Sequence, residues 1–192
     1  MISVPKMDAF VLIGGRSARM GTDKAELMVA GQRMADRVSA ALMPHSASVR
    51  FVGKCRPDWL EPVDFVADGA EARHPLHGVR AAMESARTPW VLIAPCDLVA
   101  LRAEDVAQLV ARTGPAVAYS GQDVQPLLAK LPVSWLPRVV DWIAADAPAR
   151  RLADDAHAVE LPDSALLNVN LHADLERFID AIGRHTKEGG RE

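Results

Sequence analysis

The sequence predicts an α/β protein of three layers, with a mostly parallel sheet covered by helices on both faces. Short apolar runs, as at residues 9–13 and 90–94, have the length and composition of strands buried on both sides. Segments with apolar residues at helical spacing, such as 76–86, separate these runs, as in strand–helix–strand units. The length of 192 residues suits one domain over 1–192, and we expect its charged tail, 186–192, to be disordered.

The first half of the chain alternates regularly. Strands are predicted at 9–13, 48–52, 63–67 and 90–94, a short extended piece at 27–29, and helices at 32–43 and 76–86. Ala30 and Gly31 form a turn, and Pro44 helps to end the first helix. Since parallel strands carry their ligands at their carboxyl ends, the residues after these strands are expected to meet at one edge.

The second half is less regular. Helices are predicted at 103–112, 134–145 and 172–182, and strands at 116–119, 126–130 and 165–169. Ser134 is the expected cap of the second of these helices, and Pro137 is tolerated in its first turn. Gly183 is the stop signal of the last helix.

Composition excludes several classes of function. A formal net charge of −3 and an aromatic content of 5% argue against a nucleic-acid partner. No apolar run is long enough to span a bilayer, so no membrane association is expected. Cys55 and Cys96 are the two cysteines and form no metal-type pair, which favours free thiols in a cytoplasmic protein.

A glycine-rich and basic loop follows the first strand. Gly14 and Gly15 allow the backbone to approach a ligand closely and to point successive N–H groups at it. Ser17 adds a hydroxyl, while Arg19 and Lys24 add positive charge suited to phosphate oxygens. This combination is what a triphosphate site requires, although each feature taken singly is more often a turn or a solvated charge.

The glycine spacing excludes two familiar nucleotide loops. Gly14, Gly15 and Gly21 match neither the G-x-G-x-x-G dinucleotide fingerprint nor the P-loop with its Gly-Lys-Ser/Thr ending. A dehydrogenase of the Rossmann type or a P-loop NTPase is therefore disfavoured.

The run of specified residues from Leu12 to Lys24, Leu-x-Gly-Gly-x-Ser-x-Arg-Met-Gly-x-Asp-Lys, resembles the signature of nucleotidyltransferases that activate molybdopterin or sugar phosphates. It is most similar to the molybdenum cofactor guanylyltransferases. The resemblance extends to Leu175. It implies a Rossmann-like fold of the nucleotide-diphospho-sugar transferase type, with GTP and molybdopterin as substrates, Mg²⁺ as cofactor and molybdoenzyme maturation proteins as possible partners.

The same resemblance assigns roles at the strand ends. Asp97 ends an Ala-Pro-Cys-Asp run that resembles the family's metal motif, and a carboxylate there suits Mg²⁺; a helix-capping Asp is the alternative. Asp68 corresponds to a nucleotide-contacting aspartate, or else forms a turn before Gly69. Arg19, Lys24 and Asp97 are the expected catalytic residues. The expected nucleotide-binding set is Leu12, Ile13, Gly14, Gly15, Ser17, Lys24, Asp68, Asp97 and Asn170.

Asn170 lies in an Asn-x-Asn run that resembles the family's closing motif, and either reaches the second substrate or caps the last helix. His74 replaces a glycine of the family's Gly-Pro-Leu-x-Gly run, and with His77 is expected at the surface rather than on a metal. Arg150 and Arg151 match a paired-arginine position that could hold an anionic pterin phosphate, with a solvated pair as the default.

Two departures concern the substrates. Gly53 stands where the guanylyltransferases have an asparagine that reads the base, and Gln125 stands where a histidine before proline is usual. The alternatives are therefore a sibling transferase that uses CTP or another acceptor, and a nucleotide-binding partner without turnover that assists cofactor delivery.

Overall fold

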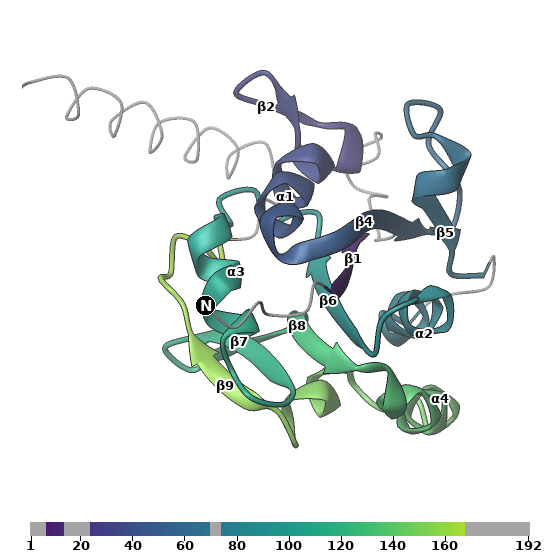
Figure 1. The fold of residues 1–192 in the computed structure, drawn as a ribbon, viewed down its shortest axis with the longest axis vertical. Helices are drawn as coiled ribbons and strands as arrows, with labels where there is room; N and C mark the ends of the chain where they lie inside the picture. The colour runs from purple at the N-terminus through teal and green to yellow at the C-terminus, as the bar shows by residue number, and fades with distance from the viewer. Residues whose placement is uncertain (1–6, 14–23, 70–73, 168–192) are drawn as a thin grey trace, which may run out of the picture.

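A computed structural model of the chain describes residues 7–13, 24–69 and 74–167. Its centre is a seven-stranded sheet, of which β8 alone is antiparallel to its neighbours (Figure 1). The strand order is β5 (Phe65–Ala67), β4 (Ser46–Gly53), β1 (Met7–Leu12), β6 (Trp90–Pro95), β8 (Asp123–Pro132), β7 (Ala116–Ser120) and β9 (His157–Glu160). The mostly parallel sheet expected from the sequence is thus confirmed.

Helices cover both faces of this sheet, which makes three layers (Figure 1). Helices α1 (Met34–Leu42) and α3 (Ala103–Val110) pack on one face, and α2 (Leu76–Ser85) and α4 (Leu136–Ala144) on the other. Short 3₁₀ turns are η1 (Lys24–Glu26), η2 (Met43–His45), η3 (Pro62–Asp64), η4 (Val133–Trp135) and η5 (Ala149–Ala153).

The side chains of the central strand β1 point alternately into two halves of the core, one on each face of the sheet. In β1, Ala9 and Val11 join the cluster under α1 and α3, whereas Phe10 and Leu12 join the cluster under α2 and α4. All six residues of β1 are buried. A strand covered on both faces has no polar side to show, which is why it reads as a continuous apolar run rather than an alternating one.

A small hairpin of β2 (Met28–Val29) and β3 (Gln32–Arg33) precedes α1. Its two turn residues both have positive φ, 49° at Ala30 and 80° at Gly31, as a tight two-residue hairpin requires. The sequence predicted the turn but assigned residues 32–33 to the helix, because a hairpin so short leaves almost no alternating pattern.

The largest error of the sequence prediction is at the last strand. β9 was missed because His157–Glu160 is mostly exposed and carries little apolar signal, yet it pairs with β7. The strand predicted at 165–169 is wrong in its described part, since residues 163–166 form a turn. The prediction that Ser134 caps the helix is also wrong, since α4 begins after Trp135 without a side-chain cap. The helix predicted at 172–182 and the tail lie outside the described residues.

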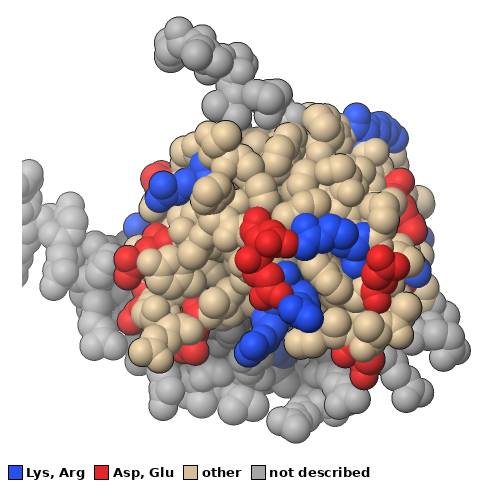
Figure 2. Space-filling model, turned by 90° about the horizontal axis from the view of Figure 1, so that it is seen from below, with Lys and Arg blue, Asp and Glu red and all other residues tan. Residues whose placement is uncertain are grey.

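The face of the molecule in Figure 2 shows Lys and Arg side chains lying beside Asp and Glu side chains. This face therefore carries no extended basic field of the kind that binds a polyanion. Within the described ranges, none of the helices combines the length and apolar character needed to cross a membrane.

Candidate active site at the carboxyl edge of the sheet

Four parallel strands end at the same level, and hydrogen bonds tie their ends together. The N–H of Asp68 after β5 donates to the C=O of Gly53 in β4 at 2.9 Å, and the N–H of Ile13 after β1 donates to the C=O of Val52 at 2.8 Å. The N–H of Cys96 after β6 donates to the C=O of Leu12 at 3.0 Å. The carboxyl edge of β5, β4, β1 and β6 is therefore one continuous ledge.

Asp97 stands at the β6 end of this ledge. Its Oδ1 is buried and has no hydrogen-bond partner among the described residues. Burial raises the pKa of Asp97, and the positive charge of Lys24, which is close enough to act on it, opposes that rise. A buried carboxylate oxygen without a donor is costly to the fold, so this geometry is that of a group kept ready for an external cation or donor.

Asp68 stands at the β5 end and is in a similar state. The residue is only 9% exposed, and its Oδ1 also has no hydrogen-bond partner in the described part of the chain. Burial raises the pKa of Asp68, against the opposing charges of Lys54, His77 and Arg80. Its Oδ1 can therefore accept a hydrogen bond from a ligand without first losing one within the described structure.

The two carboxylates are too far apart to share one ion. Three inter-strand spacings of about 4.8 Å separate β5 from β6, so the two strand ends lie about 14 Å apart. This span is comparable with the length of an extended nucleoside triphosphate. Asp97 with Lys24 therefore suits the phosphate end of such a ligand, and Asp68 suits the nucleoside end.

Helix α2 begins at the same edge, beside the end of β1. A Cβ added to Gly78 would lie 3.2 Å from Cδ2 of Leu12, so a glycine allows the first turn of the helix to press against the strand. The N–H of Leu76 donates to Nδ1 of His74 at 3.2 Å, which gives His74 a role in starting the helix. Burial is the main cause that lowers the pKa of His77, and the neighbouring charges of Arg80 and His74 act in the same direction.

Of the residues that the sequence singled out, the structure brings Leu12, Ile13, Lys24, Asp68 and Asp97 to this edge. Leu12 and Ile13 are 8% and 5% exposed and belong to opposite halves of the core, so their side chains pack on opposite faces of the sheet. Gly14, Gly15, Ser17, Arg19 and Asn170 lie outside the described residues.

Two charged residues at this edge were not singled out from the sequence. Lys54 directly follows β4, and Arg80 lies one helical turn after His77 on α2, so both act electrostatically on Asp68. Lys54 could have been predicted as a site residue, because it directly follows a strand. Arg80 could not, because only the packing of α2 on the sheet brings it near Asp68. Arg150 and Arg151 are both exposed, and Arg151 forms an ion pair with Asp154 at 2.7 Å. This agrees with the simpler of the two expectations, that these arginines are solvated.

The donor set fits a magnesium ion that travels with a phosphate ligand. Mg²⁺ prefers oxygen ligands and is commonly held by one or two carboxylates together with substrate phosphates and water. Asp97 supplies such an oxygen, unpartnered and buried. No cluster of three or more His, Cys, Asp or Glu side chains suited to a metal occurs within the described ranges, so an all-protein cage is not formed by them.

Comparison with known proteins gives this edge its context. The family model of the MobA-like NTP transferase domain matches residues 9–160, which include the described strand ends Leu12, Asp68 and Asp97. The chain belongs to this family. It is accordingly a nucleotidyltransferase.

Two curated relatives agree with the family. The chain is 33% identical to the molybdenum cofactor guanylyltransferase of Sinorhizobium fredii, with 92% of each chain covered. It is 29% identical to the enzyme of the same name from Pseudomonas syringae pv. tomato, covering 88% of this chain and 90% of the relative.

Solved structures agree on the fold. The molybdopterin-guanine dinucleotide biosynthesis protein A of Archaeoglobus fulgidus superposes with a TM-score of 0.72 at 20% identity, covering 93% of this chain and all of that one. The 2-C-methyl-D-erythritol 4-phosphate cytidylyltransferase of Thermus thermophilus gives 0.70 at 18% identity, covering 94% and 100%. At these identities the likeness concerns the architecture alone, which confirms the nucleotide-diphospho-sugar transferase type of fold.

Proposed function

We propose that this protein transfers GMP from GTP onto the terminal phosphate of molybdopterin, forming the guanine dinucleotide cofactor and pyrophosphate. The observation that carries the proposal is the unpartnered, buried Oδ1 of Asp97 next to Lys24, at the carboxyl edge of a nucleotidyltransferase sheet. The two curated relatives described above bear the name of this activity.

In this proposal the ledge divides the nucleotide between its two ends. Leu12 and Ile13, at the end of β1, lie beneath the nucleoside, and Asp68 accepts hydrogen bonds from it. Gly14, Gly15, Ser17 and Arg19 hold the phosphates, and Asn170 contacts the second substrate. These last assignments rest on the sequence motif, because the residues lie outside the described part of the chain.

The chemistry is a displacement at the α-phosphorus of GTP. An oxygen of the acceptor phosphate forms the new P–O bond, the bond to the bridging oxygen of the β-phosphate breaks, and pyrophosphate leaves with the electron pair. The acceptor phosphate is already ionised near neutral pH, so no strong general base is needed. Positioning and neutralisation of charge then provide most of the rate enhancement.

Lys24, whose positive charge acts on Asp97, stabilises the negative charge that moves onto the leaving pyrophosphate. Asp97 is the residue that would hold Mg²⁺, which when bound supplies further neutralisation of the phosphate oxygens. Asp97 must be ionised for this, and the positive charge of Lys24 favours that form.

The decisive experiment measures pyrophosphate release by the purified protein with each of the four nucleoside triphosphates, with and without molybdopterin and Mg²⁺. We expect release only with GTP, molybdopterin and Mg²⁺ together. Lys24→Ala and Asp97→Ala should each lower the rate by about a hundredfold or more, since each removes a positioned charge contact. Asp123→Ala, an exposed carboxylate in β8, is the control. Unchanged rates in both site variants would refute the mechanism.

CTP as the nucleotide is the second candidate, and Gly53 is the observation that favours it. Its backbone C=O accepts a hydrogen bond from Asp68, but it has no side chain with which to read guanine. Release with CTP in place of GTP would select this alternative. Tight GTP binding with no release of pyrophosphate would instead select a binding partner without turnover.

Both cysteines are free thiols, Cys55 exposed and Cys96 buried, which fits a reducing cytoplasm. We propose that residues 1–192 act as one domain and pass the product to molybdoenzyme maturation proteins.

A further inference from the structure

The first half of β4 has an open outer side. β5 pairs only with Phe51, Val52 and Gly53, so no described strand lies beyond residues 46–50. The C=O of Gly53 points toward β5, and the C=O of Val52 points toward β1. Because backbone groups of a strand alternate in direction, the N–H and C=O of Val49 also point to the outer side. An unpaired strand edge of this kind is a template for another strand.

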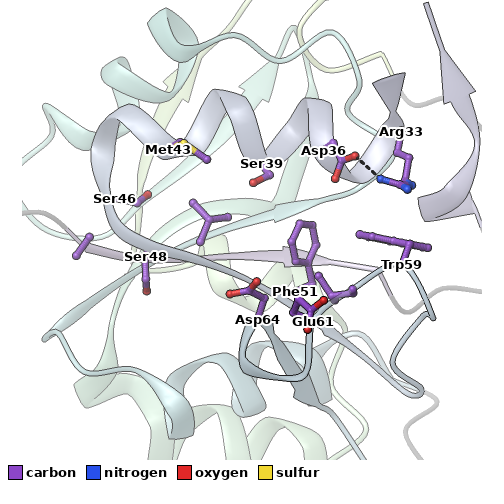
Figure 3. A pocket seen from close by; sticks show the side chains of 13 residues that line it. Arg33, Asp36, Ser39, Met43, Ser46, Ser48, Phe51, Trp59, Glu61 and Asp64 are labelled. Carbon is purple, nitrogen blue, oxygen red and sulfur yellow. Dashed lines mark hydrogen bonds and ion pairs between the residues drawn. The ribbon is translucent and has the colours of Figure 1, made fainter. Parts of the chain in front are cut away.

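A groove with a volume of about 540 Å³ runs along this same open edge, on the α1 face of the sheet. Figure 3 shows Ser39 of α1 and Met43 of η2 on one wall, and the turn that carries Glu61 and Asp64 as the other. The ring of Trp59 closes one end, with Phe51 packed edge-to-face against it at 5.7 Å between ring centres. A groove that follows a strand edge is shaped for an extended chain.

The charges in this groove favour a cationic occupant. Glu61 and Asp64 have no ion pair with any described residue. The one cation of the lining, Arg33, is already engaged, because it binds Asp36 at 3.0 Å and lies over the Trp59 ring at 4.9 Å. The groove therefore presents two uncompensated carboxylates to whatever binds in it.

Its rim also exposes apolar side chains that a folded surface usually buries. Met43 is 60% exposed, and Val63, which lies between Glu61 and Asp64 in the sequence, is 76% exposed. Apolar side chains around a polar edge are typical of a surface that binds another protein. They would pack against alternate side chains of an added strand.

We propose that the open edge of β4 and its acidic groove bind an extended segment of another protein, which adds a strand beside Val49 and directs Lys or Arg side chains toward Glu61 and Asp64. Main-chain hydrogen bonds supply affinity in this mode of binding, and side-chain pockets supply specificity. Pairing of β4 with β4 of a second copy is disfavoured, because it would bring two acidic grooves together.

The test uses the whole chain and fluorescein-labelled hexapeptides in fluorescence anisotropy. The probe alternates lysine with valine; one comparison peptide replaces lysine by glutamate, and another carries N-methyl groups at alternate residues along one backbone edge. We expect the lysine peptide to bind at least tenfold more tightly than either comparison peptide. Emission of Trp59 should change on binding, and Trp59→Phe should remove that change.

The matched variants are Glu61→Lys/Asp64→Lys in the groove and Asp123→Lys/Asp141→Lys elsewhere, the latter two exposed and without ion pairs in the described structure. Both change the net charge by the same amount. The groove variant should lose at least tenfold in affinity for the lysine peptide, and the control should stay within about twofold.

Equal losses in the two variants, or equal binding of the N-methylated peptide, would reduce the effect to non-specific attraction and overturn the proposal. Failure of the lysine peptide to bind the wild-type chain would overturn it as well. So would sedimentation that shows a dimer of the wild-type chain abolished by the groove variant. None of these results depends on nucleotidyl transfer, so the two proposals can fail separately.

Discussion

Asp8 and Asp97 are acidic residues at opposite ends of the same sheet, and their carboxylates are in opposite states. Asp8, the second residue of β1, is 2% exposed and accepts hydrogen bonds from Ser48 Oγ at 2.6 Å and from the N–H groups of Arg87 and Thr88 at 2.5 and 2.9 Å. Asp97, just beyond β6, has a buried oxygen with no such donor in the described structure.

The pKa values follow this contrast. Burial alone would raise the pKa of Asp8, but its hydrogen bonds outweigh burial and place the pKa below its usual value. Burial raises the pKa of Asp97, and only the charge of Lys24 and a backbone hydrogen bond oppose that effect. A satisfied buried carboxylate stabilises the fold, whereas an unsatisfied one is retained at a cost that a ligand can offset.

Asp97→Asn should change both stability and activity. Removing a buried charge that the fold does not satisfy should raise the Tm of the ligand-free protein by about 2–4 °C, corresponding to roughly 1 kcal/mol in a chain of this size. Activity should fall by about a hundredfold or more, because the proposed metal ligand is lost. Melting curves with and without Mg²⁺ and GTP, and pyrophosphate release, measure both. A variant that is less stable but fully active would contradict the assignment.

Asp8→Ala should behave in the opposite way. It leaves several buried donors without an acceptor, so the free energy of unfolding should fall by about 2–4 kcal/mol. Nucleotide affinity of the folded protein should be unchanged, because Asp8 lies at the other end of the sheet. Urea unfolding and nucleotide titration separate the two quantities. A loss of affinity in a variant that is still folded would show that the two ends are coupled.

Asp68→Asn tests the nucleoside end of the ledge. If Asp68 accepts hydrogen bonds from the nucleoside, its amide variant should bind GTP about tenfold more weakly, the loss of one charge-assisted bond. The Tm should not fall, because burial makes this charge unfavourable in the free protein. Isothermal titration with GTP and CTP would measure the change. An equal loss for both nucleotides would place the contact on the ribose rather than on the base.

The smallest expected effect is in the pH dependence of stability. The pKa of Asp8 is lowered, so its stabilisation is present above about pH 3.8 and is lost as pH falls through its folded pKa. The pKa of Asp97 is raised, so its destabilisation is absent below about pH 3.8 and grows as pH rises through its folded pKa.

The differences of Asp8→Ala and Asp97→Asn from the wild type should therefore have opposite signs at pH 7 and should both shrink toward pH 3. Urea unfolding across this range measures them. If the stability difference between Asp97→Asn and the wild type grew on acidification, the pKa of Asp97 would be lowered and not raised.

How far the fold could be predicted depended on burial. β1 and β6 were recognised because strands covered on both faces are continuous apolar runs, and α2 because its inward face repeats at helical spacing. β9 could not be recognised, because only Val159 of its four residues is buried, and its pairing with β7 is a long-range contact without a local signal.

The same division applies to the candidate site. Asp68 and Asp97 were found because each directly follows a strand, and parallel strands end at one edge for any sequence that forms them. Their lack of hydrogen-bond donors could not be read from the sequence, because it depends on which groups surround each oxygen after the chain has folded. Arg80 and the groove beside β4 were invisible for the same reason.

The strand–helix alternation, the family motif from Leu12 to Lys24 and the acidic residues after the strands could all be recognised in the sequence. Which carboxylates have hydrogen-bond donors became visible only in the folded chain. Asp8, which the sequence did not mark, accepts hydrogen bonds from residues about 40 and 80 positions away, whereas Oδ1 of Asp97 has no donor in the described structure. The physical reason is that hydrophobic periodicity is a local property of the chain, whereas hydrogen-bond satisfaction of a buried group depends on neighbours that only folding brings together.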